Sequence, residues 1–266
     1  HPEYLSSKYA KDRGLPTVSV QHHHAHLAAC LAEHGVEGPV LGVIFDGTGY
    51  GDDRAVWGGE LLLGDVSSYR RLGHLWPVKL PGGEAAIRQP WRMACAWLTE
   101  LEGGVPSIPP TLEGRIDAAD WRNVARMALG GLASPRTTSM GRLFDAVSAL
   151  CGLRTETTYE GQAAIDLEMI VEPTNEGDYP MPLVRSDAGV VLLDGRAIVR
   201  SVLEELQAGV EPGVISARFH AGVARGTADA CRALARTHEV SSVALSGGVF
   251  QNVVLLEDTA RRLADL

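Results

Sequence analysis

Residues 40–63, which read VLGVIFDGTGYGDDRAVWGGELLL, decide the fold class of this chain. The continuous apolar run 40–45 predicts a buried strand, and the glycine- and aspartate-rich segment 46–53 predicts its end. A second strand is expected over 55–63, where a Gly-Gly pair indicates a bulge or a close backbone approach. With a third strand over 69–76, these segments predict a β-meander.

The sequence on either side of this meander is mostly helical in pattern. Before the meander we expect a short helix over 5–12, a brief strand over 17–20 and a helix over 22–34. Near the end of the chain, a strand at 243–245 enters a final helix through the Ser-Gly-Gly segment 246–248. Between the two, the predicted helices cover residues 91–101, 117–129, 139–150, 160–170, 195–207 and 214–238. Strands, then helices, then a strand–glycine–helix unit indicate a mixed α/β architecture.

Composition narrows the class of protein. The 266 residues are enough for one large domain or two lobes, and their 45% apolar and 21% charged content is typical of a globular protein. The net charge of −9 argues against nucleic acid as the main partner. No apolar run approaches the roughly 18 residues that span a bilayer, and no signal peptide is visible. The four cysteines are widely spaced, which favours a reducing cytoplasm over a disulfide framework.

A histidine cluster, QHHHAH at 21–26, follows the predicted strand over 17–20. His22 and His26 are four residues apart, so a helix places both imidazoles on one face, as shared metal coordination requires. Asp46, at the end of a buried strand, would complete a set of two histidines and one carboxylate that suits zinc or iron equally. Alternatively, Asp46 caps the turn that follows it. His23 and His24 turn off this face and are expected behind the ligands or at the surface.

Two glycine-rich segments are candidate ligand loops. Gly47 and Gly49 allow backbone N–H groups to approach an oxyanion, although tight-turn duty explains them equally well. In LSGGVFQN, residues 245–252, a strand meets a helix where bare amides and a positive helix end favour a nucleotide phosphate. Asn252 would donate to the same ligand, and the alternative is a turn without a ligand. Asp145, mid-helix among apolar neighbours, either faces a cleft or is a partnered structural carboxylate.

Taken in order, seven motifs resemble one known family. They are VQHHHAH, FDGTGYGDD, WGGE, LPGGEAAIRQPWRMA, GRLFDAVSAL, YEGQAA and SGGVFQN. Together they resemble the C-terminal carbamoyltransferase domain of the HypF family of [NiFe]-hydrogenase maturation, which is related to the universal tRNA threonylcarbamoyl transferases. The resemblance covers essentially the whole chain and implies the two-lobed α/β fold of actin, Hsp70 and sugar kinases. It implies that 1–38 is a remnant of the first lobe with the metal-binding helix, and that 39–266 is the second lobe with a helical insertion around 78–135.

The resemblance also implies a function. HypF makes carbamoyl-adenylate from carbamoyl phosphate and ATP and passes the carbamoyl group to the C-terminal cysteine of its partner HypE. That group becomes the precursor of the cyanide ligands of the hydrogenase iron. The residues that correspond to family motifs are His22, His26 and Asp46 for a divalent metal, and Asp145, Glu160, Gly247, Gly248 and Asn252 for the nucleotide.

The chain is also expected to be truncated relative to this family. The upstream HypF modules are not in the sequence, which begins at the family segment HPEY, after the first strands of the two-lobed domain. A further metal-ligating aspartate is expected beyond residue 266. The alternatives are a carbamoyltransferase acting on a small-molecule hydroxyl or on tRNA, the latter fitting poorly with the net charge, and a non-catalytic nucleotide-binding or partner-docking module.

Overall fold

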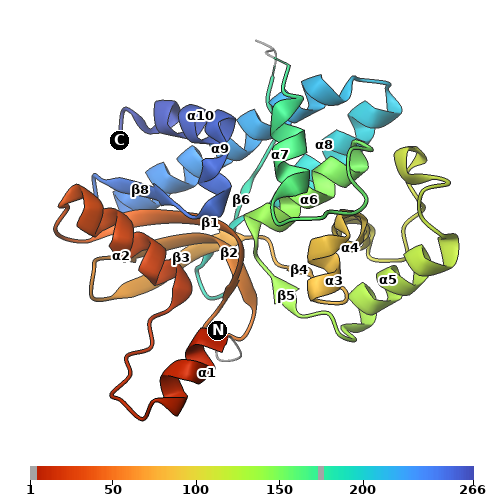
Figure 1. Cartoon of the computed structure of the whole chain (residues 1–266). Helices are drawn as coiled ribbons and strands as arrows, with labels where there is room; N and C mark the ends of the chain where they lie inside the picture. Colours follow the sequence, from red (N-terminus) through yellow and green to blue (C-terminus); the bar gives the residue numbers. More distant parts are fainter. Residues whose placement is uncertain (1–4, 173–176) are drawn as a thin grey trace.

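The predicted β-meander forms the centre of an eight-stranded mixed sheet in the computed structural model, which describes residues 5–172 and 177–266 (Figure 1). Strands β1 (Val40–Tyr50), β2 (Val56–Gly64) and β3 (Tyr69–Leu75) pair antiparallel in chain order. Strand β8 (Val243–Ser246) joins β1 in parallel, and β7 (Val191–Leu193) joins β3 in parallel. The meander and the mixed α/β class are therefore confirmed.

Three short strands that the sequence did not indicate complete the sheet. Strand β6 (Leu183–Arg185) pairs antiparallel with β7 at one edge. Strand β5 (Arg136–Thr137) meets the start of β2, and β4 (Val78–Lys79) pairs with β5. At two or three residues each, these strands are too short to show a period-2 pattern. Only pairing with a neighbour defines them.

Helices flank the sheet, and among the described ones all except α3, which the sequence did not indicate, lie at or near the predicted positions. They are α1 (Leu5–Asp12), α2 (His22–His34), α3 (Glu84–Arg88), α4 (Pro90–Glu102), α5 (Ala118–Gly130), α6 (Met140–Leu150), α7 (Gln162–Met169), α8 (Gly195–Gln207), α9 (Pro212–His238) and α10 (Val253–Leu263), with the 3₁₀ turns η1 (Pro110–Leu112) and η2 (Gly248–Gln251). Asp117 caps α5 as expected, because its side chain accepts from two backbone N–H groups of the first turn. Among residues 5–172 and 177–266, no helix is both long and apolar enough to cross a membrane.

Two hydrophobic cores lie on opposite faces of the sheet. On one face Leu41, Val43 and Phe45 pack with the buried sides of α4, α6, α8 and α9. On the other face Ile44 packs with Leu27 and other residues of α2. The alternation along β1 places its successive side chains in different cores, as a strand covered on both faces requires. The two cores fix β1 between α2 and α6.

Two local expectations are wrong. Strand β1 does not end at Phe45 but continues to Tyr50, with a register shift against β2 between Phe45 and Gly49. Residues 17–20 form no strand, and Val18 is 87% exposed. In both cases the presence or absence of a neighbouring strand explains the difference. A strand forms only where a neighbour can pair with its backbone N–H and C=O groups.

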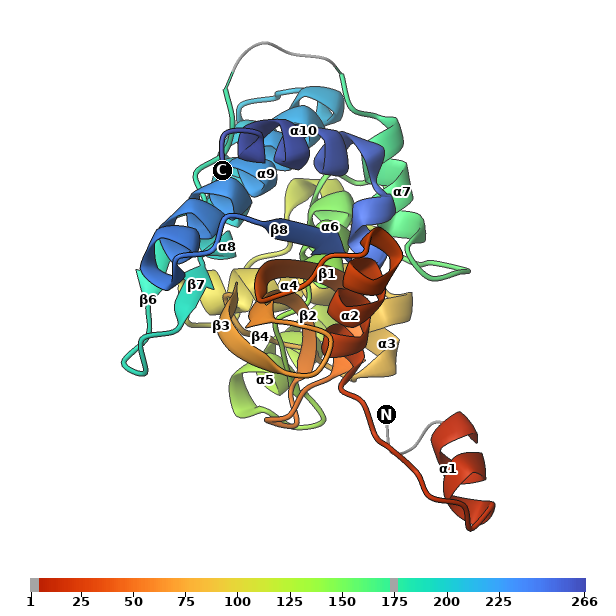
Figure 2. The same ribbon diagram turned by 90° about the vertical axis from the view of Figure 1, so that its left-hand side faces the viewer.

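Helix α1 stands apart from the body of the molecule in both views (Figures 1 and 2), and none of its eight residues is buried. The expectation that the first strands of the domain are missing is drawn from the HPEY segment. That segment, residues 1–4, lies outside the described residues. The proposed division at residues 38/39 stays a prediction.

Candidate functional site

Helix α2 presents the histidine cluster over the end of β1. Its N-cap is Gln21, whose side-chain oxygen accepts from the backbone N–H of His24 at 2.9 Å, and it ends at Gly35 in the left-handed region with φ 61°. Leu27 anchors the middle of the helix against β1. An added Cβ on Gly42 would lie 2.8 Å from a Leu27 methyl, so glycine at that position of the strand leaves room for the Leu27 side chain. The helix is thereby held with its first turn beside Asp46.

His22, His26 and Asp46 come together as the sequence predicted. The Nε2 atom of His22 lies 2.9 Å from Oδ2 of Asp46, and Nε2 of His26 lies 3.4 Å from the same oxygen. The two imidazole rings are 4.9 Å apart and perpendicular. Hydrogen bonds from both histidines and from the N–H of Gly47 outweigh the effect of burial and hold the pKa of Asp46 well below its usual range.

This set of three donors fits a divalent metal. One ligand atom from each of the three residues lies within 4.8 Å of the other two, and all three side chains remain partly accessible. Two neutral imidazole nitrogens and one carboxylate oxygen are ligands that zinc and iron both accept. Asp46 also binds the N–H of Gly47 through Oδ1 at 2.8 Å, so the turn-capping alternative is satisfied by the oxygen that does not face the histidines.

His23 and His24 lie behind the ligand pair, and the structure excludes the surface alternative because both are buried. Nδ1 of His23 accepts from the amide of Gln21 at 3.2 Å, and Nε2 of His24 donates to the carbonyl of Asp65 at 2.9 Å. Burial lowers the pKa of His23 to about 4. Gly49 lies directly against the rings of His23 and His22, since an added Cβ would be 2.4 Å from Cε1 of His23 and 2.7 Å from Cδ2 of His22. His23 and His24 therefore support the helix rather than offering ligand atoms at its surface.

The start of α6 is tied to β1 next to Asp46. The N-cap Ser139 accepts from the N–H of Arg142 at 3.2 Å, and its hydroxyl lies 2.8 Å from the carbonyl of Asp46 and 2.6 Å from that of Gly47. An added Cβ on Gly141 would lie 2.9 Å from the Cα of Gly47, so no larger residue allows this approach. The start of α6 and the Asp46–Gly47 part of β1 are thus fixed to each other.

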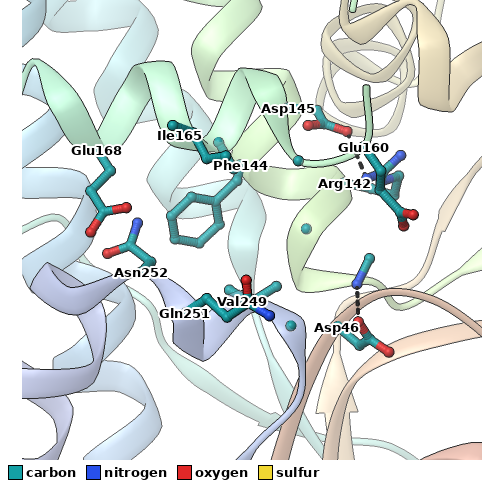
Figure 3. A pocket seen from close by; sticks show the side chains of 15 residues that line it. Asp46, Arg142, Phe144, Asp145, Glu160, Ile165, Glu168, Val249, Gln251 and Asn252 are labelled. Carbon is teal, nitrogen blue, oxygen red and sulfur yellow. Dashed lines mark hydrogen bonds and ion pairs between the residues drawn. The ribbon is translucent and has the colours of Figure 1, made fainter. Parts of the chain in front are cut away.

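A cavity of about 510 Å³ extends from here, between α6, α7 and the segment that opens α10 (Figure 3). That volume lies within the roughly 300–1,000 Å³ of small-molecule sites. Six of the predicted residues line it, namely Asp46, Gly47, Asp145, Glu160, Gly248 and Asn252. Gly49 and Gly247 do not line it. Gly247, at φ 98°, instead allows a close backbone approach, since an added Cβ would lie 2.2 Å from the carbonyl oxygen of Phe45.

The cavity wall is rich in carboxylates and has one buried cation. Asp145 lies 3.1 Å from Arg142, and both side chains are almost fully buried, so Asp145 is at once a partnered carboxylate and a lining residue. Burial, with the nearby charge of Glu160, raises the pKa of Asp145 to about 6 against the opposing effect of Arg142. Glu168 and Asp46 add further carboxylates at the two ends of the cavity (Figure 3). This wall favours a ligand with many hydrogen-bond donors, such as the hydroxyls of a ribose.

The strand does not enter the last helix directly from the glycine pair, because the turn η2, which begins at Gly248, precedes α10. Two amides in the first turn of α10 are already paired. Oδ1 of Asn252 accepts from the N–H of Leu255 at 2.9 Å, and Oε1 of Glu168 accepts from that of Val253 at 2.7 Å. Asn252 therefore acts as the N-cap of α10 while its amide group faces the cavity edge.

Sequence reasoning missed several residues that hold the site together. Glu60 is completely buried, and its carboxylate accepts from Arg71 at 2.6 Å, from Thr138 at 2.5 Å and from the N–H groups of Gly58 and Gly59. A glutamate in an apolar strand next to a Gly-Gly pair is the signal that could have found it. Ser139 gave no such signal, because the carbonyls that its hydroxyl meets, those of Asp46 and Gly47, are distant in sequence.

Comparisons with known proteins identify this arrangement. Residues 42–266 match the family model described as "Carbamoyltransferase, Kae1-like Domain, second subdomain", and residues 1–33 match "HypF Kae1-like domain". The fold and the site therefore define a Kae1-like carbamoyltransferase domain. The chain belongs to the HypF family.

Relatives and solved structures agree with this assignment. The chain is 38% identical to carbamoyltransferase HypF2 of Cupriavidus necator over 99% of its own length and 35% of the relative. A crystal structure of full-length HypF in the phosphate- and nucleotide-bound form superposes with a TM-score of 0.91 at 37% identity, covering 99% of this chain and 41% of that one. The T. kodakarensis HypF structure gives 0.87 at 28% identity, covering 100% and 36%. The chain spans about a third of the length of the first curated relatives it matches.

Proposed function

We propose that this chain is the carbamoyl-transfer domain of a HypF-type enzyme. It takes carbamoyl-adenylate, made from carbamoyl phosphate and ATP, and delivers the carbamoyl group to a cysteine thiolate for synthesis of the cyanide ligands of a [NiFe]-hydrogenase. The observation that carries the proposal is the continuity of the site. One cavity runs from Asn252 and Glu168 to Asp46, where the two histidines stand. An adenylate lying along it has its acyl end at Asp46.

The residues at this end suit a divalent cation. His22, His26 and Asp46 would hold zinc or iron, and a cation bound there supplies positive charge that offsets the adenylate phosphate. Residues of the chain itself position the ligand. Ser139 fixes the backbone at Asp46 and Gly47, and the buried Arg142–Asp145 pair forms the adjoining wall. A ligand held between rigid walls reaches the acceptor with little further loss of entropy.

The acceptor thiolate comes from another molecule in this proposal. Burial raises the pKa of Cys95, Cys151 and Cys231 to about 12, and burial also raises that of Cys30, so none of the four is an activated nucleophile. The incoming thiolate attacks the carbamoyl carbonyl, a C–S bond forms, and the C–O bond to phosphate breaks. AMP leaves with the electron pair, and the thiol proton has passed to solvent.

We further propose that the acceptor thiolate is the C-terminal cysteine of a HypE-type partner and that upstream HypF modules supply the adenylate. Four free cysteines suit a cytoplasmic setting. The neighbouring structure named as phosphate- and nucleotide-bound supports a nucleotide in this type of protein.

The test uses the intact enzyme that contains this domain. It is incubated with ATP, carbamoyl phosphate and the HypE-type partner, and mass spectrometry follows carbamoylation of the partner's terminal cysteine. The double variant His22→Ala/His26→Ala is expected to abolish the adduct. His34→Ala is the matched control, because His34 lies at the other end of the same helix, where its ring bonds the carbonyl of Cys30 at 3.0 Å. An undiminished adduct in the double variant contradicts the proposal.

The same incubation separates the alternatives. If the enzyme acts on a small-molecule hydroxyl, it would consume carbamoyl phosphate once a suitable hydroxyl compound is supplied. The partner protein would then stay unmodified. A non-catalytic nucleotide-binding module would bind AMP in calorimetry and yield no adduct on any acceptor. Binding and transfer are therefore measured on the same preparation.

A further inference from the structure

We propose that His220 is a positioning residue, which fixes the side-chain amide of Asn252 so that one of its N–H groups faces the ligand in the cavity. His220 lies in α9 and does not line the cavity, whereas Asn252 does. Nε2 of His220 lies 2.9 Å from Nδ2 of Asn252. This inference rests on the proposed nucleotide site and adds a residue behind it.

The other nitrogen of the ring determines which tautomer is present. Nδ1 of His220 lies 2.7 Å from the backbone carbonyl of Ser216, which can only accept, so Nδ1 carries the proton. The hydroxyl of Ser216 is directed elsewhere, to the carbonyl of Leu167 at 2.6 Å. In the neutral ring Nε2 is then an acceptor, and the only group it meets is the amide nitrogen of Asn252 among the hydrogen bonds of residues 5–172 and 177–266.

The ring is also held in place by its surroundings. His220 is 1% exposed, and it packs edge-on against Phe144 and Phe219 with centroids 5.3 Å and 5.5 Å away. Burial lowers the pKa of His220 to about 4, which keeps the ring neutral and Nε2 free to accept. No rotation of the ring is needed to present this acceptor to Asn252.

Asn252 is therefore oriented from two sides. Its oxygen accepts from the N–H of Leu255 at 2.9 Å, and its nitrogen donates to His220. The reverse amide orientation would set the NH₂ group against an N–H donor. One N–H of the amide remains without a hydrogen bond in the part of the chain that the structure describes. Asn252 lines the cavity beside Glu168 (Figure 3), so this N–H is the donor that a ligand meets there.

The chemistry of that donor indicates what it recognises. An N–H directed into a wall otherwise rich in carboxylates selects a hydrogen-bond acceptor on the ligand, such as a ribose or base atom of an adenine nucleotide. A donor fixed before binding loses less entropy than one that must be ordered. Without the acceptor on His220, the amide nitrogen of Asn252 has no hydrogen-bond partner. Its free N–H is then no longer held facing the ligand.

The experiment compares three variants of the full chain with AMP as the probe, in isothermal titration calorimetry. His220→Leu removes the acceptor and is expected to weaken AMP binding roughly tenfold. His220→Gln keeps an acceptor oxygen near the position of Nε2 and is expected to bind within about threefold of wild type. Thr227→Val is the matched control, because Thr227 is equally buried in α9 and its substitution leaves Asn252 untouched.

A second readout does not depend on ligand. The two Asn252 side-chain amide protons, assigned by their loss in Asn252→Ala, are followed by ¹⁵N-edited NMR without nucleotide. They are expected to be widely separated in wild type, His220→Gln and Thr227→Val, and to converge in His220→Leu. Identical spectra in wild type and His220→Leu overturn the inference, as does equal AMP affinity of the two. If wild type binds no AMP, the proposed function fails, while the NMR comparison still decides whether His220 orients Asn252.

Discussion

The hydroxyl of Ser139 lies 2.8 Å from the backbone carbonyl of Asp46, although 93 residues separate them in the chain. The same oxygen accepts from the N–H of Arg142 as the N-cap of α6. One side chain thus performs two tasks. It starts the helix that forms a cavity wall, and it fixes the part of β1 whose carboxylate faces His22 and His26.

Replacing Ser139 by alanine should therefore affect both stability and metal binding. We expect Ser139→Ala to lower the free energy of unfolding by about 1–2 kcal/mol, for the lost cap and the carbonyl left without its hydroxyl partner. Zinc affinity should fall severalfold, because Asp46 is no longer held. Urea denaturation and zinc calorimetry measure the two effects. Asp117→Ala removes the cap of α5 and should cost about 1 kcal/mol with zinc affinity unchanged. Equal zinc affinity in both variants would show that the tether is irrelevant to the site.

Gly49→Ala should damage the metal site through the histidine rings. The new Cβ would lie 2.4 Å from Cε1 of His23 and 2.7 Å from Cδ2 of His22, so the rings or the strand must move. We expect a loss of about 1–3 kcal/mol in stability from overpacking and at least a tenfold loss in zinc affinity. Gly104→Ala is the control, because nothing lies within 4 Å of its added Cβ. The prediction is contradicted if the two variants bind zinc alike.

Much of the fold was predictable because local signals coincide with the true element ends. Helix α2 ends at Gly35, a stop signal that is visible in the sequence, whereas its N-cap Gln21 is not one of the usual capping residues. The trio His22, His26 and Asp46 was predictable for a similar reason. Helical spacing pairs the histidines, and a carboxylate directly after a continuous apolar run is an uncommon pattern.

What could not be predicted depends on partners far away in the chain. The glycines after Asp46 predicted a loop, yet pairing with β2 extends the strand to Tyr50. Residues 17–20 had the composition of a strand and find no neighbour to pair with. His220 lies in an alanine-rich helix with no motif around it, and only the fold places it beside Asn252, 32 residues later.

Glu60→Gln should be strongly destabilising. Glu60 is buried and pairs with Arg71 at 2.6 Å, so removing its charge leaves the largely buried guanidinium with the exposed carboxylate of Asp53 and the hydroxyl of Thr138. We expect a loss of about 3 kcal/mol in the free energy of unfolding. Asp53→Asn removes the exposed partner of the same arginine and should cost less than about 1 kcal/mol. Chemical denaturation of the two variants measures this contrast, and equal losses would show that burial of Glu60 does not set its contribution.

The stability of the folded chain should depend on pH through His220. Burial lowers the pKa of His220 from its ordinary 6.5 to about 4, so between these values the unfolded chain binds a proton at this site that the folded chain does not. Acidification through that window therefore favours unfolding, by up to about 1.4 kcal/mol per pH unit. His23 acts in the same direction, because burial also lowers its pKa to about 4. Asp145 acts in the opposite direction, since its pKa is raised to about 6 and the folded chain takes up its proton first.

Because these contributions overlap, the difference between wild type and His220→Gln isolates the one that belongs to His220. Above pH 6.5 the difference in unfolding free energy between the two proteins should be constant. Below that pH wild type should lose stability relative to the variant, by roughly 3 kcal/mol in total by pH 4, because glutamine has no proton to gain. Urea denaturation at half-unit pH steps gives both curves. A difference that does not change with pH would mean that His220 titrates normally in the folded protein, and that its ring is not held neutral by burial.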